Sequence, residues 1–250
     1  MRQKIIHILG LAGVALMAAC SPKQQYLHTR HQAVNLTISD TIAADTGMVR
    51  FLSPYKQKMD SNMNQVIGYS EVSLTKALPE CNMGNFVADA QLDAARKLQD
   101  GVEISVVNYG GLRIPFIPKG AITKGRVYEL MPFDNMVTIL EVPGDILLQF
   151  CNHMAKRKGW PVSGITYVIR NGQAEQVLVQ GKAVNPHLVY KVAVSDYIAN
   201  GGDDCDFLKS CKKYPSSVFL RDAIMDKVRS SALSGNTIYL DLQNRVRNAE

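Results

Sequence analysis

Hydrophobic residues recur at helical spacing in some segments of the chain and at strand spacing in others. The apolar residues between Met48 and Met63 keep helical spacing and predict an amphipathic helix that is interrupted near Pro54. A second apolar stripe begins after Gly84-Asn85 and predicts a helix up to Leu98. Further helices are predicted over residues 123–130, 146–155 and 221–231. Strands are predicted over residues 66–74, 102–107, 136–142, 165–170, 176–179, 190–194 and 238–242.

The order of these elements mixes strands and helices without a regular alternation of the two. That order favours an α+β fold over a doubly wound parallel sheet, which needs a strict βαβ rhythm. We expect a single domain over residues 46–250, because this length suits one large domain and the sequence shows no internal repeat. The polar, mixed residues over 20–45 are typical of a tether that precedes such a domain.

Residues 1–19 have the anatomy of a targeting segment. A basic start, Met1-Arg2-Gln3-Lys4, precedes an apolar run that is too short to cross a membrane as a stable helix. The run ends in Leu16-Met17-Ala18-Ala19-Cys20, and small residues before a lone cysteine resemble the lipobox of bacterial lipoproteins. The resemblance implies a signal peptide cut before Cys20, lipidation of Cys20, and an exported lipoprotein anchored at the periplasmic face or in the outer membrane. An ordinary secretory signal is the alternative.

The net charge of +6 adds little to this picture, because the basic residues are scattered along the chain. The sequence contains no long basic tract of the kind that binds nucleic acid, so we expect no nucleic-acid polymer as a partner. A small anionic ligand is compatible with the charge. Cys205 and Cys211 are close enough in sequence to bridge a short loop in an exported protein, and free thiols are the alternative.

The segment Ser195–Asp204 carries the most informative chemistry. It places Tyr197 six residues before Asp203, with a Gly-Gly turn between them. A tyrosine ring can stack on a flat base, and a carboxylate can accept hydrogen bonds from a ribose hydroxyl or a base N–H. The pair therefore predicts a pocket for a ligand with a planar ring. A loop with favourable turn residues is the alternative interpretation.

Three other segments could contribute to the same pocket. In the run Asn108–Arg113, paired glycines let the backbone approach a ligand, and Arg113 offers a forked cation to phosphate or ribose oxygens. Asn135 offers both a donor and an acceptor between a predicted helix and a predicted strand. Trp160, the only tryptophan, lies in a loop with Gly and Pro and is a second candidate stacking ring. For each of these segments a purely structural role is the alternative.

Residues for hydrolytic chemistry are missing from the sequence. A two-metal phosphoesterase needs several Asp, His and Asn ligands close together, whereas the five histidines here are scattered and form no such motif. The sequence has neither a Gly-x-Ser-x-Gly elbow nor a Gly-rich phosphate loop that ends in Gly-Lys. We therefore expect no metal site, no cofactor and no catalytic residue in this chain.

Taken in chain order, the motifs resemble the C-terminal, substrate-binding domain of the 5'-nucleotidase family over residues 48–245. The motifs that carry the resemblance are Glu80…Gly84-Asn85…Asp89, Asn108–Arg113, Pro132–Asn135, Val162-Ser163-Gly164 and Asn200–Asp203. The resemblance implies a mixed-sheet fold in which two aromatic residues clamp the base of a nucleoside or nucleotide. Tyr197 would be one of these residues and Trp160 the other. The rest of the ligand would be held by Asn108, Arg113, Asn135 and Asp203.

Enzymes of this family carry a metallophosphoesterase domain ahead of the C-terminal domain, and that domain holds two metal ions and the catalytic residues. The predicted tether is too short to hold such a domain. The resemblance therefore implies the nucleotide-recognition part of a split phosphoesterase that acts in extracytoplasmic nucleotide breakdown. Divalent metals and hydrolysis would belong to a separate metallophosphoesterase chain. A non-enzymatic lipoprotein that binds nucleosides is the alternative.

Overall fold

The computed structural model describes residues 42–249. The predicted signal peptide over 1–19, the predicted lipidation site Cys20 and most of the predicted tether lie outside these residues. The chain divides into a unit that ends at Val49 and a larger unit that begins at Arg50, and every element of the candidate site belongs to the larger unit. Within residues 42–249, no helix combines the length and the apolar character that crossing a membrane requires.

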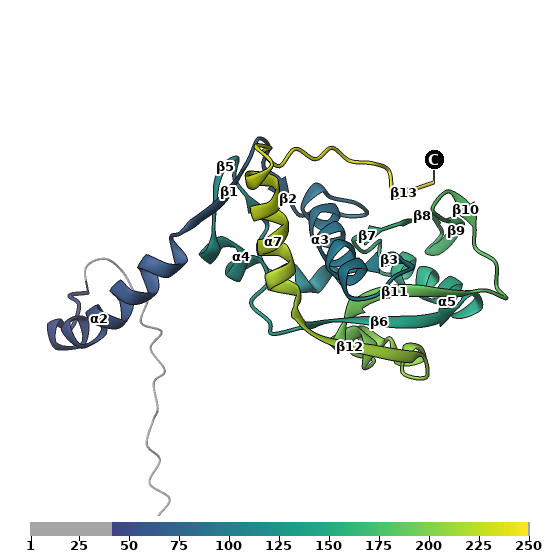
Figure 1. Cartoon of the computed structure of the whole chain (residues 1–250), viewed down its shortest axis with the longest axis horizontal. Coiled ribbons are helices and arrows are strands. Elements are labelled where there is room, and N and C mark those ends of the chain that lie inside the picture. The colour runs from purple at the N-terminus through teal and green to yellow at the C-terminus, as the bar shows by residue number, and fades with distance from the viewer. Residues whose placement is uncertain (1–41, 250) are drawn as a thin grey trace, which may run out of the picture. The chain divides into compact units, whose positions relative to one another are not determined.

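A five-stranded sheet forms the centre of the larger unit (Figure 1). Its strands, in spatial order, are β12 (Lys212–Phe219), β6 (Met136–Pro143), β11 (Val189–Ser195), β3 (Val102–Val106) and β7 (Val162–Ser163). β11 runs parallel to β3 and antiparallel to β6, so the sheet is mixed and the α+β prediction is confirmed. As a result, the carboxyl ends of β3 and β11 lie beside the amino end of β6.

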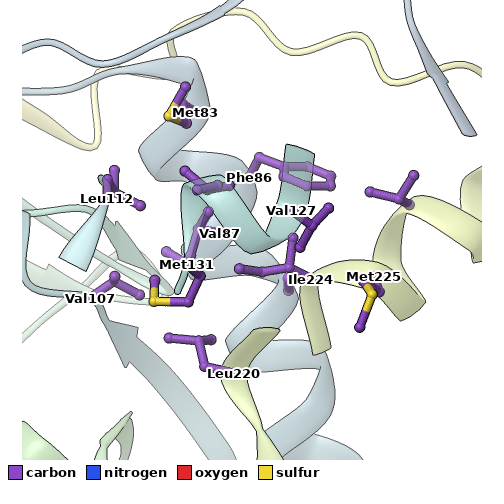
Figure 2. Packing of buried hydrophobic residues seen from close by; sticks show 14 of the residues in the cluster. Met83, Phe86, Val87, Val107, Leu112, Val127, Met131, Leu220, Ile224 and Met225 are labelled. Carbon is purple, nitrogen blue, oxygen red and sulfur yellow. The ribbon is translucent and has the colours of Figure 1, made fainter. Parts of the chain in front are cut away.

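Side chains of β11 alternate between two hydrophobic cores, because successive residues of a strand point to opposite faces of a sheet. The helices that supply these cores are α3 (Asn82–Leu98), α5 (Gly144–Lys156) and α7 (Leu220–Leu233). Ala193 of β11 belongs to the core with α3 and α7, whose apolar side chains point toward one another in Figure 2. Val192 and Val194 belong to the core with α5. Apolar packing on both faces holds the central strands in a fixed arrangement.

A second sheet and two short strand pairs complete the described β-structure. The second sheet has the order β10 (Lys182–Ala183), β9 (Gln173–Val179), β8 (Ile165–Arg170) and β13 (Val246–Asn248). Asn171 and Gly172 join β8 to β9 with positive φ angles of 51° and 73°, the conformation for which Asn-Gly is favoured in hairpin turns. The two short pairs are β1 (Val66–Ser70) with β5 (Gly120–Thr123), and β2 (Leu74–Thr75) with β4 (Phe116–Ile117).

An ion pair ties the C-terminal strand to the helix that covers the central sheet. Arg245, next to β13, donates to both carboxylate oxygens of Asp89 on α3, at 2.7 Å and 2.9 Å. Asp89 also accepts a hydrogen bond of 2.6 Å from the hydroxyl of Ser163 in β7. Asp89 and Ser163, which belong to two of the sequence motifs described above, therefore take part in the same structural contact.

The helix predicted to break near Pro54 is continuous, which corrects the sequence-based expectation. α2 spans Thr46–Met63 with Pro54 inside it and buries none of its residues. A proline inside a helix leaves the carbonyl four residues earlier, that of Arg50, without a backbone donor. Because this helix is exposed, water can bind that carbonyl. For the same reason the apolar stripe that predicts α2 is not part of the core.

Two strand predictions were also wrong. The segment predicted as a strand over 66–74 forms two strands, β1 and β2, which pair with different partners. The segment over 238–242 contributes only a single bridge, from Ile238 to Ser70, and the C-terminal strand is β13 instead. β12 was not predicted, because it lies at the edge of the sheet, contains Pro215 and shows no clear alternation of apolar residues.

Candidate functional site

Three loops meet where three neighbouring strands of the central sheet begin or end. The loop after β3 contains Asn108 and Arg113, together with the short turn η1 (Tyr109–Gly111). The loop before β6 contains Phe133 and Asn135, after helix α4 (Lys124–Leu130). The loop after β11 contains α6 (Asp196–Ala199) and η2 (Gly202–Asp204). Residues that lie far apart in the sequence are thereby brought to one place.

These loops enclose a pocket of about 280 Å³. Its lining consists of Asn108, Gly110, Gly111, Arg113, Phe133, Asn135, Tyr197 and Asp203. The structure thus brings together five of the six residues that the sequence analysis selects, namely Asn108, Arg113, Asn135, Tyr197 and Asp203. Their part in binding a ligand stays a prediction.

Tyr197 and Asp203 contact each other directly. The hydroxyl of Tyr197 donates to Oδ1 of Asp203 at 2.9 Å, and the backbone N–H of Asp203 donates to the same hydroxyl at 3.1 Å. Nδ2 of Asn108 donates to Oδ2 of Asp203 at 2.8 Å. Each carboxylate oxygen keeps a further lone pair for a ligand. The hydrogen bond to Asp203 raises the pKa of Tyr197, so this side chain stays a neutral donor.

Gly202 allows the ring of Tyr197 to lie against the loop. A Cβ atom at this position would come within 2.5 Å of Cε1 and Cζ of Tyr197. The Gly-Gly turn noted in the sequence is therefore required for close packing as well as for the turn itself. With the ring held in this way, 46% of Tyr197 remains exposed at the pocket.

Trp160 does not lie in the pocket, which corrects the prediction that it faces Tyr197 across a ligand. Trp160 is only 3% exposed and belongs to the core with α5. Its ring packs edge-on against Phe150 and His153, with ring centroids 6.1 Å and 5.7 Å away. A large aromatic ring gains more from burial against these two rings than from exposure in a loop, so it became part of the core.

Phe133 is the second exposed aromatic ring of the pocket, and the sequence analysis missed it. It is 41% exposed and lines the pocket together with Tyr197. The guanidinium of Arg113 lies over its ring, 5.4 Å from the centroid. A signal was present, because Phe133 belongs to the motif Pro132–Asn135 from which only Asn135 was selected.

A buried arginine holds the loop that carries Phe133. Nη2 of Arg221, on α7, lies 2.7 Å from Oδ1 of Asp134, and Nη1 donates to the carbonyls of Pro132 and Phe133 at 3.4 Å. The guanidinium also lies 4.3 Å from the ring centroid of Tyr128 on α4. Arg221 therefore holds the loop through two backbone carbonyls and the side chain of Asp134.

Two cations lie near each other beside the pocket. Lys76 donates to the carbonyl of Leu112 at 2.7 Å, and its ammonium group lies 4.1 Å from the ring centroid of Tyr109. Burial lowers the pKa of Lys76, and the positive charge of Arg113 lowers it further. Within residues 42–249, neither Lys76 nor Arg113 has a carboxylate partner in a salt bridge. An anionic group of a ligand would relieve this repulsion.

Another cavity, of about 460 Å³, is lined by residues of α3, of the strands β7 to β9 and of the segment before β13, but it is chemically less suited to a ligand. Arg96 and Arg245 line it together with aliphatic, small and amide side chains. The guanidinium of Arg245 is already paired with Asp89, and Nε of Arg96 donates to the carbonyl of Val102. The cavity offers no exposed aromatic ring in its lining, so we place the candidate site in the pocket of Tyr197 and Phe133.

The cysteines and acidic residues of the described part show no metal centre. No group of three or more His, Cys, Asp or Glu side chains within residues 42–249 is placed to hold a metal ion. Cys205 and Cys211, considered above as a disulfide pair, are both buried free thiols in the structure.

Comparison with known proteins identifies the family. The family model for the 5'-nucleotidase C-terminal domain matches residues 66–210, so the chain belongs to the 5'-nucleotidase C-terminal domain family. A 5'-nucleotidase of Vibrio parahaemolyticus is 29% identical over 185 residues, which are 69% of this chain and 31% of that protein. The chain therefore spans about a third of that relative's length.

Solved structures of related proteins agree with this assignment. The 5'-nucleotidase precursor of Thermus thermophilus superposes with a TM-score of 0.71 at 27% identity, over 80% of this chain and 42% of that one. The sulfate thiohydrolase SoxB of the same organism superposes with a TM-score of 0.59 at 16% identity, over 80% of this chain and 37% of that one. At this identity the second match shows the fold alone.

Proposed function

We propose that this chain recognises a nucleoside or nucleotide in the pocket between Tyr197 and Phe133. It would act as the substrate-binding part of a 5'-nucleotidase-type phosphoesterase whose metal ions belong to a separate chain. The observation that carries the proposal is the pocket itself, in which two half-exposed aromatic rings lie beside a fixed carboxylate and the guanidinium of Arg113. Membership of the 5'-nucleotidase C-terminal domain family supports the choice of a nucleotide over other planar ligands.

Each part of the pocket suits one part of a nucleotide. Aromatic rings stack on bases of any identity, because every base has a π-face. The free lone pairs of Asp203 can accept from ribose hydroxyls or a base N–H, and Asn135 can both donate and accept. Arg113 and the nearby Lys76 supply positive charge for a phosphate. The proposed chemistry of this chain is binding and orientation only.

Hydrolysis would be performed by the partner chain. A two-metal centre activates water and stabilises the attacking and leaving oxygens of the phosphate ester, provided that the substrate is held in line. In the proposed assembly this chain holds the substrate against that centre. The predicted lipid on Cys20 would anchor the assembly to a membrane outside the cytoplasm. The second proposal is a lipoprotein that binds nucleosides without an enzymatic partner. The phosphate-release experiment below separates this proposal from the first.

Calorimetry with a panel of nucleosides and nucleoside monophosphates tests recognition. We expect binding of at least one member of the panel, and a double substitution Phe133→Ala with Tyr197→Ala should abolish it. Tyr239→Ala is a matched control, because Tyr239 is 59% exposed and its hydroxyl lies 3.1 Å from Oδ2 of Asp241, outside the pocket. Absence of heat with every member of the panel would overturn both proposals.

Phosphate release then tests the split enzyme. A metallophosphoesterase chain encoded beside this one, or recovered with it from the native membrane, is assayed with and without the purified protein. We expect faster release from nucleoside monophosphates when both chains are present, and no gain when the double variant replaces the wild type. Binding without any gain in release, with every such chain, would favour the non-enzymatic lipoprotein.

A further inference from the structure

The carboxylate of Asp203 faces the pocket although its backbone has an unfavourable conformation. Asp203 and Asp204 have φ angles of 51° and 60°. These angles lie in the left-handed region, which residues other than glycine seldom adopt. Two such residues in succession persist only where surrounding contacts hold them. The contacts inside the pocket, from Tyr197 and Asn108, bind the carboxylate and the N–H of Asp203 but leave its carbonyl free.

A histidine from α5, which does not line the pocket, binds that carbonyl. Nε2 of His153 lies 2.9 Å from the carbonyl oxygen of Asp203. Nδ1 of the same ring lies 3.4 Å from Nη1 of Arg157, which can only donate. Nδ1 must therefore accept, and Nε2 carries the hydrogen that is donated to Asp203. The ring also packs edge-on against Trp160 and Phe207, with centroids 5.7 Å and 5.4 Å away, so it is held between two aromatic side chains.

The nearby thiol of Cys205 suggests a nucleophile and its base, but the geometry argues against that role. Sγ of Cys205 lies 3.6 Å from Nε2 of His153. The base of such a pair must turn a lone pair toward the thiol, whereas Nε2 turns a hydrogen toward Asp203. Burial raises the pKa of Cys205 to about 12, and burial lowers the pKa of His153. Both groups are therefore neutral near pH 7, and Cys205 is fully buried.

We propose that His153 is a positioning residue for ligand recognition, because it fixes the backbone of Asp203 so that the carboxylate stays between Asn108 and Tyr197. This inference rests on the proposed function in so far as it concerns a ligand. Arg157 adds to the effect by holding Nδ1 as an acceptor and by contacting Oδ2 of Asp204 at 2.5 Å. That second contact contributes little by itself, since the side chain of Asp204 is 87% exposed.

Two substitutions of His153 separate the hydrogen bond from the packing. His153→Phe keeps an aromatic ring between Trp160 and Phe207 but removes the donor. His153→Gln removes the ring but can place an amide N–H close to the position of Nε2. His187→Phe is the control for the change of residue type, because His187 is exposed in a turn outside the pocket. Thermal unfolding confirms that each variant is folded, and His153→Asn, whose amide is too short to reach Asp203, replaces His153→Phe if the latter does not fold.

Amide hydrogen exchange of the ligand-free protein gives the first measurement. The N–H groups of Asp203 and Cys205 donate within the loop, to the hydroxyl of Tyr197 and the carbonyl of Gly202, at 3.1 Å each. We expect faster exchange over residues 201–205 in His153→Phe, and exchange near the wild-type rate in His153→Gln and His187→Phe. This measurement does not depend on the proposed function. Equal exchange in wild type and His153→Phe would overturn the positioning role.

Affinity gives the second measurement. With AMP, GMP, CMP and UMP as probes, we expect His153→Phe to bind the tightest of them about tenfold more weakly, in keeping with the loss of one well-placed hydrogen bond. His153→Gln should recover most of that loss. Wild-type affinity in His153→Phe together with a loss in His153→Gln would show that the ring alone matters and would overturn the inference. If the wild type binds no nucleoside or nucleotide of the calorimetry panel, the proposed function fails, while the exchange result still decides whether His153 holds the loop.

Discussion

The hydroxyl of Tyr197 donates to Oδ1 of Asp203 at 2.9 Å and accepts from the backbone N–H of the same residue at 3.1 Å. This pair of hydrogen bonds closes a ring across the glycines that separate the two residues. The aromatic face and the carboxylate are therefore held in one fixed relation before any ligand arrives. A pocket arranged in advance loses little conformational freedom on binding, which favours affinity.

Tyr197→Phe and Tyr197→Ala should differ in their effect on ligand affinity. The phenylalanine keeps the stacking face and loses only the contacts to Asp203, so we expect a small loss. The alanine removes the face as well, and base stacking on an aromatic ring is worth about 1–3 kcal/mol. Calorimetry with the tightest nucleotide measures both values. A larger loss in Tyr197→Phe than in Tyr197→Ala would be inconsistent with a stacking role.

Gly202→Ala should weaken binding with little loss of stability. The new Cβ would lie 2.5 Å from the ring of Tyr197, and φ at this position is not positive, so the ring must move while the backbone need not. Gly172→Ala is the opposite case, because its Cβ would meet no atom within 4 Å, but its φ is 73°. We expect that control to lose about 1 kcal/mol of stability and no affinity. Unchanged affinity in Gly202→Ala would argue against the ring as a ligand contact.

Asp89→Ala should destabilise the fold far more than removal of an exposed aspartate. It would leave the guanidinium of Arg245, of which 10% is exposed, without its carboxylate, and breaking a buried pair costs about 3–5 kcal/mol. Asp226→Ala removes the partner of Arg229 in an exposed pair, where about 0–1 kcal/mol is expected. Urea unfolding compares the two. Similar losses in both variants would mean that the Asp89 pair does not tie β13 to α3.

The free energy of unfolding should fall at alkaline pH partly because of Cys151. Burial raises the pKa of this thiol from its ordinary 9.0 to about 12. Between these values the unfolded chain releases a proton that the folded protein retains, so the contribution of the thiol is complete below pH 9 and is lost as the pH rises toward 12.

Urea unfolding at pH 8 and pH 10 measures this contribution. Cys151→Ala should lose less stability between the two pH values than the wild type does. Burial raises the pKa of Tyr167 in both proteins, and the smaller upward effect of Cys151 on that pKa is lost with the thiol, which changes the pH dependence in the same direction. An identical pH dependence in the two proteins would assign the effect to other groups.

The sequence was most informative where a motif directly follows or precedes a strand. Asn108, Tyr197 and Asp203 could be selected because the loop beside a strand end has a predictable place relative to the sheet. Their meeting in one pocket depends on the mixed order of β6, β11 and β3, which only the family resemblance implied. The structure has that fold and brings the three residues together, and their roles in binding stay predictions.

The two failures at the site have a common physical cause, because they concern tertiary contacts between separate elements, which local pattern does not show. Trp160 looked exposed beside Gly and Pro, but Phe150 and His153 of α5 enclose it. Phe133 looked like part of a turn, and nothing local indicates that Arg221, far along the chain, fixes that turn so that the ring lines the pocket. The local sequence pattern predicts which helix, strand or loop carries a side chain, whereas tertiary packing decides whether that side chain is buried.

The meeting of three loops at neighbouring strand ends has a consequence for resistance to unfolding. A ligand that contacts the ends of β3 and β11 and the beginning of β6 would connect three segments that lie far apart in the sequence. If one loop opened locally and exposed its contacts with such a ligand, the contacts of the ligand with the other two loops would loosen as well. Bound nucleotide should therefore act as a non-covalent cross-link of the central sheet, slowing proteolysis and hydrogen exchange well beyond the pocket itself.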